Sequence, residues 1–236
     1  MTTNPLDEAH FAENPEPRCP VVLLLDTSAS MQGEPINELN AGLQAFAEAV
    51  KEDKLAALRV EVALITFGGA ARVIDGRGGS ERMIAPDASQ AFLTIDGFQP
   101  PTLTVAGETL MGAAVRMGLQ ILRDRKVSYK QNSIDYFRPW LFLITDGHPT
   151  DEWQTAAQEV KQEEARKSLL FFGVGVKDAD MQTLAAFSEQ RQPLKLHGMA
   201  FGELFQWLSK SLSVVAHSRP GEQAPLPPVG WAQVDT

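Results

Sequence analysis

The chain has 236 residues, of which 44% are hydrophobic and 22% are charged. This composition is typical of a soluble globular protein and excludes collagen-like and largely disordered chains. The 21 basic and 30 acidic residues give a net charge of -9. A surface of this sign lacks the positive charge that binds a phosphate backbone, so we expect no nucleic-acid partner.

The single cysteine, Cys19, excludes an internal disulfide, and this absence favours a cytoplasmic location. Residues 1–20 are polar and contain no apolar signal core. No later segment approaches the roughly twenty apolar residues that a membrane span requires. We therefore expect no contact with a membrane.

The first predicted element is a strand at residues 21–25, an apolar run that indicates burial on both faces of a sheet. Apolar residues at helical spacing follow between residues 36 and 50, with Pro35 at the start of that helix. Residues 59–67 are rich in β-branched and aromatic side chains and predict a second strand. The glycine pair that follows indicates a hairpin to an antiparallel edge strand at residues 71–74.

The second half of the chain repeats the alternation of helices and strands. Residues 110–121 have helical spacing, residues 140–144 and 169–176 are apolar strands, and a weaker strand signal lies at residues 193–196. Asp151, with Gln154 three positions later, indicates the N-terminus of another helix. A last amphipathic helix is predicted between residues 201 and 215.

This alternation predicts an α/β fold with a doubly wound, Rossmann-like, mostly parallel sheet, one antiparallel edge strand and helices on both faces. Residues 19–216 form the expected domain. Residues 1–18 are acidic and irregular, and residues 217–236 are rich in proline. We expect both of these segments to be extended tails.

Polar oxygen-bearing side chains follow two of the apolar strands, and another precedes a helix. Asp26, Ser28 and Ser30 stand at alternate positions after the first strand, Asp146 follows the strand at residues 140–144, and Thr109 precedes a helix. The carboxyl ends of parallel strands meet at one edge of a sheet, so these side chains are expected to converge there. Their oxygen atoms suit a hard divalent cation, and a site with few direct carboxylate ligands suits Mg²⁺, which retains several waters.

These five residues resemble the Asp-x-Ser-x-Ser, Thr, Asp pattern of the von Willebrand factor A domain, over residues 19–216. The resemblance implies a metal-ion-dependent adhesion site in which Ser28, Ser30 and Thr109 contact the metal and Asp26 and Asp146 hold the shell. It implies a non-enzymatic interaction module whose cation, Mg²⁺ with Ca²⁺ or Mn²⁺ as alternatives, receives an acidic side chain from a protein partner.

Two longer segments resemble the TerY-type bacterial proteins that are linked to tellurium resistance. These segments are residues 145–153, with the sequence TDGHPTDEW, and residues 227–231, with the sequence PPVGW. The resemblance implies a cytoplasmic protein connected with stress resistance, in some cases alongside a kinase and a phosphatase.

The sequence departs from the family at Glu108, because many members have Gly-Gly-Thr where this chain has Gly107-Glu108-Thr109. The Glu108 carboxylate could be solvated or could compete for the open metal position. We expect it to be solvated, since the residue beside a loop ligand normally points away from the site.

Two enzymatic alternatives remain open at the level of sequence. Asp26 could be the nucleophile of a magnesium-dependent phosphoryl-transfer enzyme, although Ser28 stands where such phosphatases need a second aspartate. Ser28 or Ser30 could be a hydrolase nucleophile, although the Gly-x-Ser-x-Gly elbow is missing. His148 lies two residues after Asp146 and is expected to be an exposed loop residue rather than a functional one.

Overall fold

The computed structural model describes residues 11–230 and 232–233. Most of the expected N-terminal tail and Trp231 therefore lie outside the described residues. The strands are β1 (Cys19–Asp26), β2 (Val60–Phe67), β3 (Ala71–Ile74), β4 (Met83–Ile84), β5 (Leu93–Thr94), β6 (Trp140–Thr145), β7 (Leu170–Gly175), β8 (Leu194–Leu196) and β9 (Ala232–Gln233).

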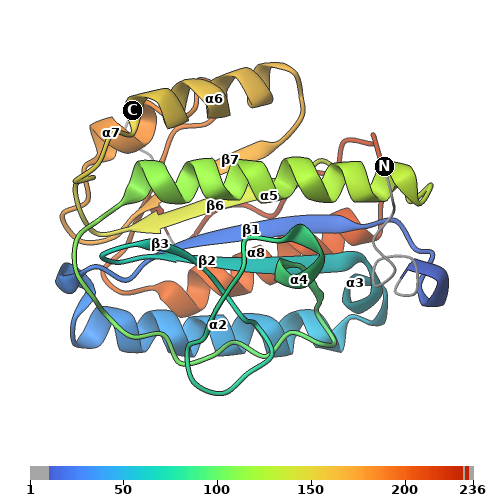
Figure 1. Cartoon of the computed structure of the whole chain (residues 1–236), viewed down its shortest axis with the longest axis horizontal. Coiled ribbons are helices and arrows are strands. Elements are labelled where there is room, and N and C mark those ends of the chain that lie inside the picture. Colours follow the sequence, from blue (N-terminus) through green and yellow to red (C-terminus); the bar gives the residue numbers. More distant parts are fainter. Residues whose placement is uncertain (1–10, 231, 234–236) are drawn as a thin grey trace.

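These strands form one mixed sheet in the order β4-β3-β2-β1-β6-β7-β8-β9, with β5 paired to β2 (Figure 1). The central strands β2, β1, β6, β7 and β8 are parallel, as the apolar runs predict. Antiparallel pairing occurs at β3, as expected, and also at β4, β5 and β9. The sheet is therefore doubly wound, with more antiparallel pairing at its borders than the one expected edge strand.

Helices cover both faces of the sheet. The helical segments are η1 (Ala29–Met31), α2 (Glu34–Glu52), α3 (Lys54–Arg59), α4 (Ala88–Ala91), α5 (Met111–Gln131), α6 (Gln154–Ala165), α7 (Met181–Ala185) and α8 (Phe201–Ala216). In Figure 1, α5 and α6 lie on one side of the sheet, and α2 and α8 lie on the other.

The side chains of β1 alternate between two hydrophobic cores. Val21, Leu23 and Leu25 pack in the core beneath α2 and α8. Val22 and Leu24 pack in the core beneath α5 and α6. Because successive side chains of a strand point to opposite faces, a strand in the middle of a doubly wound sheet must be apolar throughout. This requirement explains why β1 appears in the sequence as an uninterrupted apolar run.

A buried ionic cluster lies at the amino end of the parallel strands. The Glu61 carboxylate accepts hydrogen bonds from Arg18 Nε at 2.9 Å, Arg125 Nη2 at 2.8 Å and Tyr129 Oη at 2.5 Å. Phe11 is buried and lies within cation–π distance of both arginines. The segment assigned to the N-terminal tail therefore contributes two buried side chains, Phe11 and Arg18, to the domain.

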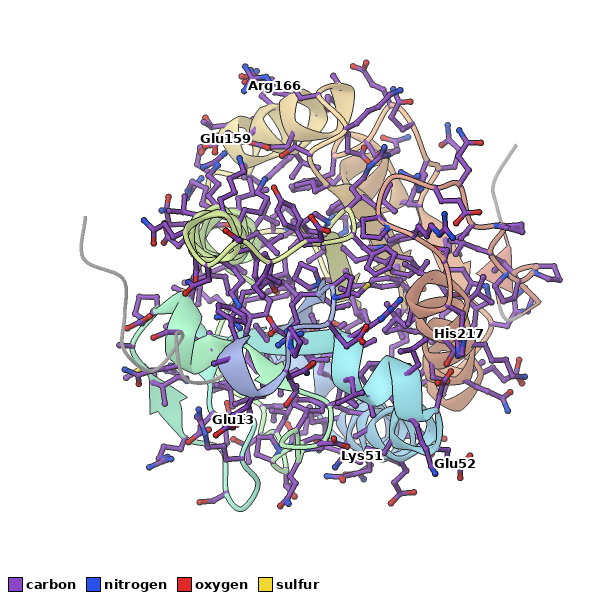
Figure 2. All side chains as sticks on the ribbon, turned by 90° about the vertical axis from the view of Figure 1, so that its right-hand side faces the viewer. Glu13, Lys51, Glu52, Glu159, Arg166 and His217 are labelled. Atoms are coloured by element: carbon purple, nitrogen blue, oxygen red, sulfur yellow. The ribbon has the colours of Figure 1, made fainter. Side chains whose placement is uncertain are left out.

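Figure 2 views the molecule from this amino-end side, on which the side chains of Lys51, Glu52 and His217 can be located. Beyond α8 the chain has no helix or strand until β9, in agreement with its proline content. This segment is nevertheless tied to the domain, because Trp207 Nε1 donates a hydrogen bond to the carbonyl oxygen of Pro227 at 2.8 Å. Among the helices of the described residues, none combines the length and the apolar character needed to cross a membrane.

Candidate metal centre

Asp26 is the last residue of β1, and the chain turns at once into η1. Ser28 N–H donates to Asp26 Oδ1 at 2.8 Å, so the carboxylate holds the turn that follows its own strand. The turn places the hydroxyl oxygens of Ser28 and Ser30 3.0 Å apart. Asp26 and Ser28 are buried, whereas Ser30 is exposed at the rim. The alternate spacing of the two serines therefore presents two hydroxyls at the carboxyl end of β1.

The parallel register of β1 and β6 brings the second aspartate to the same place. Leu25 pairs with Ile144, so Asp26 is level with Thr145, and Asp146 follows directly. Ser30 Oγ donates to Asp146 Oδ1 at 2.6 Å across 116 residues of sequence. The prediction that the ends of these two strands meet is confirmed, because the two apolar runs are neighbours in the sheet.

Thr109 reaches the same edge from the loop before α5. A Cβ atom placed on Gly147 would lie 3.3 Å from Thr109 Oγ1 and 3.8 Å from Ser30 Oγ. The two hydroxyls therefore converge over the glycine that follows Asp146, where a larger residue would crowd them. Thr109 is buried, and its carbonyl oxygen accepts a hydrogen bond from Thr150 N–H at 2.9 Å.

The helix that Asp151 and Gln154 were expected to mark does begin at Gln154, but Asp151 does not cap it. In the first turn of α6, Thr155 N–H donates a hydrogen bond to Glu152 Oε1 at 2.7 Å. The carboxylate of Asp151 instead accepts hydrogen bonds from Gly112 N–H at 2.9 Å and Ala113 N–H at 2.7 Å. It therefore caps the first turn of α5, whose free N–H groups attract a negative charge. The local spacing could not reveal this, because the capped helix lies about forty residues upstream in the sequence.

Close packing of backbone holds the two loops together at this point. A Cβ atom on Gly112 would lie 2.1 Å from the carbonyl oxygen of Glu152, so only glycine permits this approach. Asp151 and Gly112 together join the loop after β6 to the start of α5. Since Thr109 directly precedes that start, they fix the position of its hydroxyl relative to Asp146.

The donor set fits a divalent cation bound mainly through hydroxyls. Asp26 is fully buried, and burial raises the pKa of its carboxyl above the ordinary value, against hydrogen bonds from Ser28 and Thr145 that lower it. A nearby cation would favour the ionised form of this carboxyl. Ser28, Ser30 and Thr109 would hold the ion, with Asp26 and Asp146 fixing and neutralising the shell. Mg²⁺, which keeps several waters, suits such a site.

The surroundings of Asp26, Ser28 and Ser30 can be compared with the needs of the two enzymatic alternatives. Both oxygens of Asp26 accept hydrogen bonds, from Ser28 N–H and Thr145 Oγ1, and the side chain has no exposed surface. A phosphoryl group could therefore reach this carboxylate only if the turn that covers it moved. Among the described residues, no histidine hydrogen-bonds to Ser28 or Ser30. His148 is exposed, as expected, and pairs with Asp180 at 3.1 Å.

Glu108 also behaves as expected. Its side chain is exposed, and its carbonyl oxygen accepts a hydrogen bond from Gly69 N–H at 2.8 Å. Two residues that contact the site were missed from the sequence. Thr145 donates to Asp26, and Lys177 reaches the site from the end of β7. A threonine that ends an apolar run gives no separate signal, and Lys177 stands in a loop with no motif.

Comparison with solved structures shows the fold. A von Willebrand factor type A domain from Catenulispora acidiphila matches with a TM-score of 0.55 at 16% identity over 84% of this chain. The pilus adhesin SpaC from Lactobacillus rhamnosus GG matches with a TM-score of 0.59 at 15% identity over 86%. Proximal thread matrix protein 1 from the mussel byssus matches with a TM-score of 0.52 at 15% identity over 85%.

The match covers 43%, 30% and 49% of those three chains, respectively, so this chain spans half of their length or less. No curated protein sequence matches it. The family model of the von Willebrand factor type A domain matches residues 21–201, which extend from β1 to the first residue of α8. The chain therefore belongs to the von Willebrand factor type A domain family.

Proposed function

We propose that this chain is a non-enzymatic protein-binding module that uses a divalent cation, with Mg²⁺ as the expected ion, to capture an acidic side chain of a partner. The observation that carries the proposal is the convergence of Ser30 Oγ, Thr109 Oγ1 and Asp146 beside Gly147. Domains of this family generally mediate protein–protein interactions, which supports the same class of function.

The arrangement of charges explains how such a site would work. Three of the five proposed residues contribute neutral hydroxyls. These hydroxyls leave much of the charge of the ion uncompensated. Asp26 accepts a hydrogen bond from the backbone N–H group of Ser28, and Asp146 accepts one from the Ser30 hydroxyl. Both carboxylates supply the negative charge that retains the ion. The bound cation would supply the positive charge that receives the partner carboxylate. The remaining surface is acidic overall, with a net charge of -9, and would repel acidic proteins that do not reach the ion.

The biological setting is also part of the proposal. We propose a cytoplasmic protein of the TerY type, connected with tellurium resistance and with a kinase- or phosphatase-linked system. The support is the resemblance of residues 145–153 and 227–231, together with the single cysteine. Residues 145–153 include Asp146 and Asp151, both of which take part in the geometry of the site.

A peptide array tests the partner chemistry. Each glutamate-containing peptide is paired with a version that carries glutamine, and binding is measured with Mn²⁺ and with EDTA. We expect a subset of the glutamate peptides to bind, and this binding to vanish with glutamine, with EDTA and with Asp26→Asn. Asp96→Asn, at an exposed position, is the matched control and should bind normally. Capture that persists with glutamine peptides or with EDTA would reject the proposed mechanism.

A further inference from the structure

Lys177 reaches the candidate metal centre from a fourth segment of the chain. Its Nζ donates a hydrogen bond to the carbonyl oxygen of Ser30 at 3.3 Å and lies 3.8 Å from Asp146 Oδ2. Among the described residues, this is the one ion pair that involves any of the five proposed site residues. The ammonium group therefore pairs with a carboxylate that is also one of the five proposed site residues.

The backbone around Lys177 fixes the point from which the side chain extends. Val176 N–H donates to the carbonyl oxygen of Thr145 at 2.8 Å, which holds the end of β7 against β6. Lys177 itself has a φ of 51°, in the left-handed region that side-chain-bearing residues seldom adopt. Ala179 N–H closes the following turn by donating to the carbonyl oxygen of Val176 at 3.0 Å. The lysine is thus placed by the sheet rather than by a free loop.

The exposure of the two partners shows what the ammonium group does there. The side chain of Asp146 is 2% exposed, whereas that of Lys177 is 33% exposed. A buried carboxylate needs a compensating charge, and Lys177 supplies one from the solvent side. A divalent cation held by Ser30 and Asp146 would meet this ammonium group at the same carboxylate, where two positive charges repel each other.

We propose that Lys177 is a built-in counter-ion that competes with the divalent cation for Asp146 and so weakens metal binding at this site. The inference rests on the proposed function. The competition raises the cation concentration at which the site becomes occupied, since the ion must displace an ammonium group that already neutralises the carboxylate. Lys177 is therefore a residue that sets metal affinity, although it is not itself a ligand.

Substitutions at Lys177 separate its charge from its hydrogen bond. Lys177→Gln keeps an N–H donor for the Ser30 carbonyl oxygen and removes the charge, and Lys177→Arg keeps both. Lys54→Gln makes the same charge change at the exposed first residue of α3, away from the site. The affinity of each protein for Mg²⁺ and Mn²⁺ is measured by titration calorimetry at constant ionic strength.

We expect Lys177→Gln to bind Mg²⁺ at least about fivefold more tightly than the unsubstituted chain, because a repelling charge is removed. Lys177→Arg and Lys54→Gln should each stay within about twofold, since the first keeps the charge and the second removes a charge that solvent screens. In EDTA, Lys177→Gln should also melt at a lower temperature, because Asp146 then lacks its counter-ion.

The possible outcomes distinguish this inference from the proposed function. If the unsubstituted chain binds the cation and Lys177→Gln binds it equally or more weakly, Lys177 is a structural tie and the inference fails alone. If only Lys177→Gln binds, the competition between Lys177 and the cation is supported, but the proposed function fails because the unsubstituted chain does not take up the ion. If neither protein binds Mg²⁺ or Mn²⁺, the proposed function and the inference both fail.

Discussion

Thr145 Oγ1 donates a hydrogen bond to Asp26 Oδ2 at 2.5 Å, and the two residues are separated by 119 positions in the sequence. Both side chains are buried. The bond links the end of β6 to the end of β1, where the chain turns toward Ser28 and Ser30. Asp26 is thus oriented from two sides, by Thr145 and by the N–H group of Ser28.

Thr145→Val tests this relationship, because valine keeps the shape of threonine and removes the hydroxyl. We expect a loss of about 1–3 kcal/mol in the free energy of unfolding, since a buried carboxylate oxygen loses its donor. Metal affinity should fall by about 10–100-fold, the usual effect of removing a group that orients a ligand. Urea unfolding and Mn²⁺ titration measure the two effects. An unchanged metal affinity would show that this bond does not orient the site.

Asp151→Ala tests the link between the loop after β6 and the start of α5. We expect a stability loss of about 1 kcal/mol, because the first turn of α5 loses its cap. Metal affinity should also fall, because Thr109 directly precedes that turn.

Asp87→Ala provides the matched control for this substitution. Asp87 caps α4 by accepting a hydrogen bond from Ser89 N–H at 2.9 Å. Asp87→Ala should lower the free energy of unfolding by a comparable amount and leave Mn²⁺ binding unaltered. Equal Mn²⁺ affinities for Asp151→Ala and Asp87→Ala would mean that Asp151 serves helix stability alone.

Glu61→Gln should be the most destabilising of these changes. Removing the carboxylate leaves Arg18 and Arg125 buried without their counter-ion, which costs about 3–5 kcal/mol for a broken buried pair. Glu52→Gln, at an exposed position near the end of α2 (Figure 2), should change the free energy of unfolding by less than about 0.5 kcal/mol. Similar losses in the free energy of unfolding for the two variants would show that the buried ionic cluster does not stabilise the fold.

The same cluster predicts a pH dependence. Burial acts to raise the pKa of Glu61, but the charges of Arg125 and Arg18 and the hydrogen bonds from Arg125 and Tyr129 outweigh it and hold the pKa below its ordinary value. A lowered folded-state pKa gives stability that is present above the unfolded pKa of about 4.3 and is lost as pH falls below it. Between about pH 6 and pH 3, the free energy of unfolding measured in urea should therefore fall more steeply for the unsubstituted chain than for Glu61→Gln.

Cys19 should be inert in the folded protein. The thiol is fully buried, and burial together with the charge of Glu61 raises its pKa to about 12. The thiolate, which is the reactive form, is therefore scarce near neutral pH. Ellman's reagent at pH 8 should label the chain only after addition of denaturant. Rapid labelling of the native protein would contradict this burial.

The central part of the fold is predictable from sequence because its strands are buried on both faces. β1, β6 and β7 must be apolar throughout to serve two cores, and this produces continuous runs that stand out. The short strands β4 and β5 have two residues each, too few for any periodicity to appear. Their positions are set by pairing with β3 and β2, which is information that the local sequence does not contain.

The candidate site divides in the same way. Asp26, Ser28, Ser30 and Asp146 follow predictable strands, so parallel pairing was enough to bring them together. Thr145, Lys177 and the capping role of Asp151 depend on contacts between distant segments. Each of them acts on a partner more than thirty positions away, where spacing along the chain carries no signal.

The most direct test of the account is the number of Mn²⁺ ions bound by the purified chain, measured by the loss of the free-ion signal in electron paramagnetic resonance. We predict one saturable site that excess Mg²⁺ empties, that Asp146→Asn abolishes and that Asp96→Asn preserves. No uptake of Mn²⁺ by the unsubstituted chain, or equal uptake by Asp146→Asn, would contradict the central claim that these converging oxygens hold a divalent cation.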